Sequence, residues 1–174
     1  MIHAKTWTNL LFYASVGREH VKDNTVSVKS SNSQTLDRKR LILLVDDDEA
    51  QLEYLSVILK TSGYNVVSFQ DAITALQAIR GGVGIDLVIT DHCMPVMSGL
   101  EFVKTLRCML PAVPVIMLTA HVDIDSFFRA INLGIFEYIN KPVSNSELLK
   151  IVRVALATDV PGGIHAARKE NTSL

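Results

Sequence analysis

The chain has 174 residues, of which 48% are hydrophobic and 20% charged, and this length favours one domain with additional segments. With 17 basic and 18 acidic residues the formal net charge is −1, so the composition does not indicate a nucleic-acid binder or a binder of anionic membranes. The two cysteines, Cys93 and Cys108, lack metal-binding spacing and are too few for a disulfide framework, which favours a reducing, cytoplasmic location.

The first 40 residues differ in composition from the rest of the chain. An apolar run at 10–17 is too short to span a membrane, and its weakly basic start disfavours a signal peptide. Residues 22–37 are rich in Ser, Asn, Thr and Lys and have almost no apolar periodicity. We therefore expect 1–40 to be an N-terminal extension, largely a polar linker or disordered, followed by a folded domain over 41–158.

From residue 41 onward, strand patterns alternate with helix patterns. Short apolar runs predict strands at 41–45, 65–69, 86–90, 115–118 and 136–140. Apolar spacing with start and stop signals predicts helices at 49–63, 71–82, 99–110, 123–134 and 145–157. Asp71 and Ser98 are candidate N-caps, and Gly63 and Gly81 are candidate helix stops. Residues 159–174 have no such pattern and are expected to be a flexible C-terminal tail.

This alternation predicts an α/β fold in which a parallel sheet has helices on both faces, giving three layers. In such a sheet the loops after the carboxyl ends of the strands meet at one edge, and ligands bind there. Polar side chains follow four of the five expected strands at this edge: Asp46, Asp47 and Asp48, then Asp91, then Thr119, and finally Lys141.

Each of these residues has an ordinary structural explanation when taken alone. Acids favour the first turn of a helix, an aspartate forms turns, a threonine caps helices, and a lysine is usually solvated. Together, however, several carboxylates at one edge repel one another unless a cation lies among them. Oxygen ligands favour Mg²⁺ as that cation. A carboxylate nucleophile, Mg²⁺, a hydroxyl and an ammonium group together indicate phosphoryl transfer to an aspartate.

Four motifs occur in order on the expected strands: LILLVDDDEAQ, DLVITDHCMPVMSGLEFVKTLR, PVIMLTA and GIFEYINKPVS. In combination they resemble the receiver domain of response regulators from two-component signal transduction systems, over about residues 41–157. The resemblance implies a flavodoxin-like, doubly wound sheet of five parallel strands in the order 2-1-3-4-5, flanked by five helices.

The resemblance also implies a Mg²⁺ site and a phosphoacceptor, which is Asp91. The implied metal ligands are Asp46, mainly through metal-bound water, Asp47, Asp91 and the backbone carbonyl of Cys93. Asp48 is instead expected at the start of the following helix.

The remaining implied roles concern the phosphoryl group and the switch that it drives. Thr119 and Lys141 would contact the phosphoryl group, and Thr119 would act with Tyr138 as the switch. Pro142 would follow a cis peptide bond. His121 and Cys93 flank the expected path of attacking water and would tune the lifetime of the phosphoryl group.

A receiver of this kind is a signalling phosphoacceptor that phosphorylates and dephosphorylates itself, and it is not an ordinary enzyme. The implied partners are a sensor histidine kinase or histidine phosphotransfer protein and a downstream protein. The helix at 123–134, the strand at 136–140 and the helix at 145–157 would form the face that reports phosphorylation. The many apolar residues of this face suggest a covering partner or a homodimer.

No output module is recognisable after residue 157, which favours a stand-alone receiver without direct nucleic-acid or membrane binding. Three alternatives remain open. The chain could be a receiver piece of a hybrid histidine kinase, or a degenerate receiver that binds a partner without phosphorylation. It could also be a phosphohydrolase of the haloacid-dehalogenase type, with its nucleophile in the acidic run after the first strand.

Overall fold

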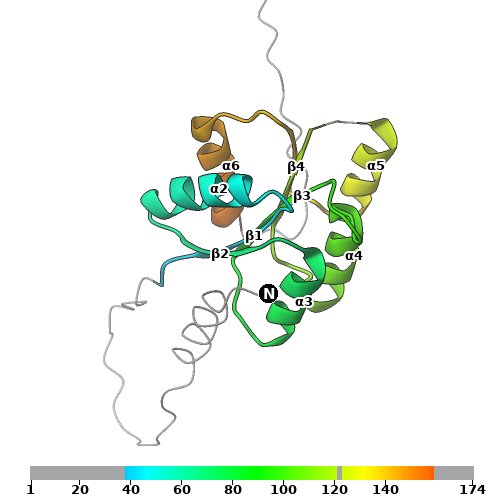
Figure 1. Cartoon of the computed structure of the whole chain (residues 1–174), viewed down its shortest axis with the longest axis horizontal. Coiled ribbons are helices and arrows are strands. Elements are labelled where there is room, and N and C mark those ends of the chain that lie inside the picture. The colour runs from blue at the N-terminus through cyan, green and yellow to red at the C-terminus, as the bar shows by residue number, and fades with distance from the viewer. Residues whose placement is uncertain (1–37, 121–122, 159–174) are drawn as a thin grey trace, which may run out of the picture.

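The computed structural model describes residues 38–120 and 123–158 (Figure 1). The predicted tail at 159–174, His121, and all but the last three residues of the predicted N-terminal extension lie outside the described residues.

Five strands and five helices alternate along the described part of the chain. The strands are β1 (Leu41–Val45), β2 (Asn65–Phe69), β3 (Leu87–Asp91), β4 (Val115–Thr119) and β5 (Glu137–Asn140). The helices are α2 (Glu49–Thr61), α3 (Ala72–Arg80), α4 (Gly99–Met109), α5 (Ile124–Asn132) and α6 (Asn145–Ala157). Each predicted strand and helix is therefore present, with its ends shifted by a few residues at most.

The strands form one parallel sheet in the order β2-β1-β3-β4-β5, which confirms the predicted fold class. Helices α2 and α6 cover one face, and α3, α4 and α5 cover the other (Figure 1). In β1, Leu41, Leu43 and Val45 face the core under α3 to α5, whereas Ile42 and Leu44 face the core under α2 and α6. Because both faces are buried, the strands read as continuous apolar runs.

Side-chain N-caps fix where several helices begin. The predicted N-caps are confirmed: Asp71 accepts a hydrogen bond from the Thr74 backbone N–H, and Ser98 forms a reciprocal capping box with Glu101. Asp48 caps α2, so this acid lies at the helix start as expected. The ordinary reading of Thr119 as a helix cap is wrong, because Asp123 caps α5.

Among the described residues, Gly63, Gly82 and Gly134 adopt a positive φ shortly after α2, α3 and α5. Gly63 has a φ of 95° and follows the end of α2, as the sequence predicted. After α3, Gly81 keeps a helical φ of −68°, and it is Gly82, with a φ of 87°, that turns the chain. The predicted helix stop at Gly81 is confirmed, because α3 ends at Arg80 and Gly81 is its C-cap.

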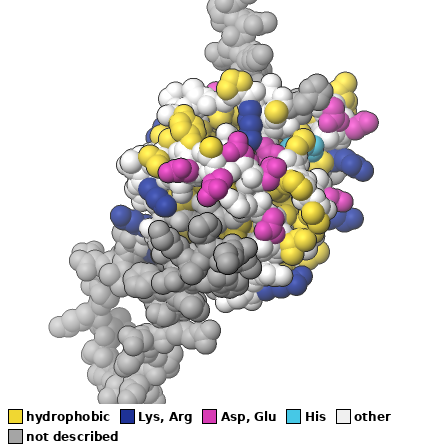
Figure 2. Space-filling model, in the orientation of Figure 1, with side chains coloured by type: hydrophobic (Ala, Val, Ile, Leu, Met, Phe, Trp, Pro, Cys, Tyr) yellow, Lys and Arg dark blue, Asp and Glu magenta, His cyan; other side chains and the backbone are white. Residues whose placement is uncertain are grey.

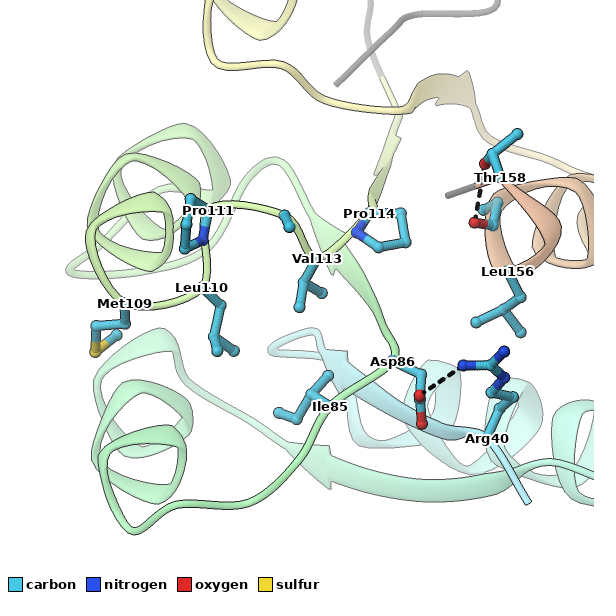
Figure 3. A pocket seen from close by; sticks show the side chains of 12 residues that line it. Arg40, Ile85, Asp86, Met109, Leu110, Pro111, Val113, Pro114, Leu156 and Thr158 are labelled. Carbon is cyan, nitrogen blue, oxygen red and sulfur yellow. Dashed lines mark hydrogen bonds and ion pairs between the residues drawn. The ribbon is translucent and has the colours of Figure 1, made fainter. Parts of the chain in front are cut away.

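The residues just before β1 are fastened to the amino edge of the sheet. Asp86 forms ion pairs with Arg38 at 2.9 Å and Arg40 at 3.1 Å, and its carboxylate accepts a 2.7 Å hydrogen bond from the Leu41 backbone N–H. Figure 3 shows Arg40 and Asp86 in a hollow that is also lined by Leu110, Pro114 and other residues. This hollow lies at the edge opposite the predicted site.

In the described ranges, 38–120 and 123–158, no helix is both long and apolar enough to cross a membrane.

Glu137 is a buried carboxylate on the edge strand β5, with 9% of its surface exposed. Among the described residues it makes no ion pair with a basic side chain. Burial raises its pKa from 4.5 to about 7, with a smaller contribution from Glu147, while a hydrogen bond from the Tyr138 backbone N–H acts in the opposite direction. The folded protein therefore binds a proton here more tightly than the unfolded chain does.

We predict that Glu137 makes the protein less stable as pH rises. Between pH 4.5 and about 7 the folded state holds the proton and the unfolded state releases it, so the free energy of unfolding falls with rising pH. Urea denaturation should show Glu137→Gln gaining about 1–3 kcal/mol relative to the parent between pH 5 and pH 8. Glu53→Gln on the exposed side of α2 should show no such gain. Parallel pH profiles for Glu137→Gln and the parent would contradict the prediction.

Gly99 allows α4 to start directly against the end of β3. Its backbone N–H donates a 2.9 Å hydrogen bond to the His92 carbonyl, and a Cβ atom at this position would collide with the backbone of Asp91. We predict that Gly99→Ala lowers the free energy of unfolding by about 1–3 kcal/mol, measured by urea denaturation. Gly84→Ala is the matched control, because its added methyl meets only an ordinary contact. Equal losses in the two variants would contradict the prediction.

Candidate functional site

The acidic run after β1 divides into a buried and an exposed part. Asp46 directly follows the strand and is only 4% exposed, whereas Asp47 and Asp48 are exposed. The Asp46 carboxylate accepts a 3.0 Å hydrogen bond from the Asp48 backbone N–H, so the turn into α2 holds this side chain in place. One predicted metal ligand is therefore fixed at the carboxyl edge of the sheet, and the other, Asp47, faces solvent.

Asp91 is the last residue of β3, and it is 7% exposed. One of its carboxylate oxygens accepts a 2.6 Å hydrogen bond from the Cys93 backbone N–H. Cys93 itself is exposed, two residues along the loop. Because β3 lies beside β1 in the sheet, Asp91 and Asp46 end neighbouring strands and lie at the same edge.

Lys141 joins these two carboxylates. It follows β5, and its Nζ donates to Asp46 Oδ2 at 3.0 Å and to Asp91 Oδ1 in a second, short hydrogen bond. Its backbone N–H donates to the Thr119 carbonyl at 2.6 Å, which fixes the start of the loop against β4. The peptide bond from Lys141 to Pro142 is cis, the geometry that the family resemblance implied.

The charges of this trio perturb one another. Burial raises the pKa of Asp46, as does the nearby Asp91, and these effects exceed the opposing ones of the Asp48 N–H and Lys141. Burial alone would lower the pKa of Lys141, but its hydrogen bonds to Asp91 and Asp46 raise it overall. The lysine therefore stays protonated and partly offsets the repulsion between the two acids. Figure 2 shows several acidic side chains (magenta) close together near the middle of the view, with a basic side chain (dark blue) beside them.

Thr119 and Tyr138 lie on the two strands beyond Asp91 in the sheet. Thr119 is fully buried at the end of β4, and Tyr138, the second residue of β5, is 9% exposed. Burial raises the Tyr138 pKa, while the neighbouring Thr119 side chain acts in the opposite direction. The Tyr138 ring packs edge-on against His92, at 5.9 Å between centroids, and against Phe127, at 6.1 Å.

The residues predicted to bind Mg²⁺ supply only oxygen donors. Asp46 and Asp91 are paired through Lys141 at the carboxyl edge, and Asp47 and Cys93 adjoin them in sequence. No three acidic, histidine or cysteine side chains cluster tightly enough to hold a metal ion by themselves within the described ranges. Mg²⁺ takes few carboxylates and keeps several waters, so this donor set fits it. The Cys93 carbonyl as a ligand stays a prediction.

Two features of the loop between β3 and α4 were not predicted from the sequence. His92, directly after Asp91, packs against Tyr138 across the sheet edge, and its Nδ1 atom is buried without a hydrogen bond. Val96 has a φ of 67°, rare for a β-branched residue, and is 93% exposed. Nothing in the sequence marks Val96 as left-handed. For His92, the signal in the sequence is its position directly after the expected phosphoacceptor, Asp91.

Comparison with known proteins agrees with this geometry. A family model described as "Response regulator receiver domain" matches residues 42–153. The transcriptional regulatory protein GlrR of Escherichia coli K12 is 34% identical over 120 residues, which cover 69% of this chain and 27% of that protein. The response regulator protein TodT of Pseudomonas putida is 36% identical over 121 residues, covering 69% of this chain and 52% of TodT. The chain thus spans about a quarter to a half of these relatives.

Solved structures give the same result for the fold. A CheY-like receiver domain protein from Methanospirillum hungatei has a TM-score of 0.66 at 30% identity, covering 68% of this chain and 94% of that one. The chemotaxis protein CheY4 of Vibrio cholerae has a TM-score of 0.64 at 30% identity, covering 68% of this chain and 99% of that one. With the sheet order and the acids at its carboxyl edge, these matches establish that the chain belongs to the response regulator receiver domain family.

Proposed function

We propose that this receiver accepts a phosphoryl group on Asp91 from a histidine kinase or a histidine phosphotransfer protein, in a reaction that requires Mg²⁺. The observation that carries this proposal is the sharing of one lysine between Asp46 and Asp91 at the carboxyl edge of the sheet. Family membership removes the haloacid-dehalogenase alternative, because that reading places the nucleophile after β1 and leaves Asp91 and Lys141 without a role.

The chain's own residues provide positioning and charge for the transfer. An Asp91 carboxylate oxygen bonds to phosphorus as the bond from phosphorus to the donor histidine nitrogen breaks. Lys141, which already contacts Asp91, and Thr119 would bind the equatorial oxygens, and the Cys93 N–H that contacts Asp91 would hold the carboxylate in position. Mg²⁺, held through Asp46, Asp47, Asp91 and the Cys93 carbonyl, would supply charge neutralisation. Later attack by water on phosphorus would regenerate Asp91.

Phosphorylation would be reported by the face formed by α5, β5 and α6. On α6, Leu148, Val152 and Ala155 are buried in the core, whereas Val154 is 42% exposed. More apolar surface is exposed on α5, where Ile124, Phe128 and Ile131 are 74%, 58% and 41% exposed. We propose that α5 contributes the apolar contacts to a downstream protein or a second copy of the chain.

We propose that the receiver passes its signal by contact with a downstream protein. GlrR is named a transcriptional regulatory protein, but the match covers only 27% of it. We propose that this domain does not itself bind nucleic acid, in keeping with the net charge of −1 on the chain. The free, exposed thiols of Cys93 and Cys108 support action in a reducing compartment such as the cytoplasm. A stand-alone receiver and a piece of a hybrid kinase both fit these observations.

We predict a single phosphoryl adduct after incubation with Mg²⁺ and acetyl phosphate, detected by intact-mass spectrometry. Asp91→Asn should lack the adduct because it removes the nucleophile, and EDTA should abolish it in the parent. Asp86→Asn, at the opposite edge of the sheet, is the matched control and should keep the adduct. Binding of beryllofluoride by the parent would reveal a competent site whose adduct hydrolyses too fast to observe. An adduct that persists in Asp91→Asn, or a parent that binds neither reagent, would contradict the proposal.

A further inference from the structure

His92 and Tyr138 present two buried polar atoms that make no hydrogen bond. Among the described residues, His92 Nδ1 and the Tyr138 hydroxyl are the buried side-chain atoms without a hydrogen-bond partner. They belong to rings in direct contact, with centroids 5.9 Å apart and planes at 74°. A buried polar atom left unpaired is costly, and native proteins rarely keep one without a reason.

The surroundings of Tyr138 restrict what could pair with its hydroxyl. The ring is held between His92 and Phe127, and Phe127 offers no polar atom. Thr119 is a second polar neighbour among the described residues, since hydrogen bonding with its side chain opposes the rise in the Tyr138 pKa. In the proposed function Thr119 turns to the phosphoryl group, and this movement would leave His92 Nδ1 as the polar atom adjoining the hydroxyl.

We propose that His92 is a positioning residue for the switch: when Asp91 carries a phosphoryl group, the Tyr138 hydroxyl hydrogen-bonds His92 Nδ1 and the ring is retained inside. The proposal rests on the proposed function at Asp91. A hydroxyl both donates and accepts, so the bond forms with either tautomer of the imidazole. The bond removes two unsatisfied atoms at once, and it joins the loop that follows the phosphoacceptor to β5, the strand before α6.

The coupling between these residues follows from linkage. A bond that forms only in the phosphorylated conformation stabilises that conformation, and it must therefore tighten binding of a phosphoryl mimic by the same factor. One neutral hydrogen bond corresponds to roughly a three- to tenfold change in affinity. The effect of His92 should depend on the Tyr138 hydroxyl, because His92 acts through Tyr138.

The test is a double-mutant cycle on beryllofluoride affinity in Mg²⁺ at one fixed pH. The variants are His92→Phe, which keeps a ring but removes the nitrogen, Tyr138→Phe, and the two combined. We expect each single variant to weaken binding by roughly three- to tenfold, and the double variant to be no weaker than either. NMR spectra of the Tyr138 ring should show the mimic shifting its signals in the parent and much less in His92→Phe.

Phe127→Leu is the matched control, because it removes the other ring contact of Tyr138 but no polar atom. In this background His92→Phe should still weaken binding by the same factor. Unfolding curves of every variant check that each is folded, and Tyr138→Phe alone tests the hydroxyl if His92→Phe does not fold. An unchanged affinity in His92→Phe, or the same loss with and without the Tyr138 hydroxyl, would overturn the proposal. A parent that binds no beryllofluoride would instead overturn the proposed function, and this inference with it.

Discussion

The ion pair network of Lys141 is the interaction on which the site depends. Its ammonium group donates to Asp46 and Asp91, two carboxylates that are 4% and 7% exposed and that arrive from separate strands. Burial and the neighbouring Asp91 raise the pKa of Asp46, so this acid tends to hold its proton. A protonated aspartate is a poor nucleophile and a poor metal ligand. By keeping a positive charge between them, Lys141 allows both acids to remain available.

The parallel sheet makes this arrangement possible. Asp46, Asp91 and Thr119 end or directly follow β1, β3 and β4, which are neighbours in the sheet, and Lys141 follows β5 at its edge. Thr119 thus lies between the proposed phosphoacceptor and the strand that carries Tyr138. In our proposals a change at Asp91 would be passed to β5 through Thr119 and through His92. Both routes end at Tyr138, which packs against Phe127 of the exposed helix α5.

The sequence predicted those features that arise from local pattern. Continuous apolar runs identified β1 and β3 because both faces of the sheet are covered, and Asp71 and Ser98 were recognised as caps from their position before helical runs. The edge with Asp46, Asp91 and Lys141 followed from the rule that parallel strands place their carboxyl ends together.

Features that depend on side-chain direction were beyond sequence reasoning. The contact of His92 with Tyr138 requires knowing which way two rings point from different loops and strands. Glu137 is a further example, because a charged residue on an edge strand is expected to be exposed, yet this one is buried. The ion pairs of Asp86 with Arg38 and Arg40 were likewise not predicted. On α6 the sequence alone could not separate buried apolar residues such as Leu148 from exposed ones such as Val154.

The most direct test of the role of Lys141 is the stability of Lys141→Met with and without Mg²⁺. Methionine keeps an unbranched, apolar stem but no charge, so in EDTA the variant should lose about 3 kcal/mol of unfolding free energy at neutral pH because two buried acids lose their shared cation. Mg²⁺ should then restore more stability to the variant than it adds to the parent, because the metal takes over the neutralisation without competing with the ammonium group. A variant as stable as the parent in EDTA, or one that gains no more from Mg²⁺, would show that the carboxylates do not depend on Lys141.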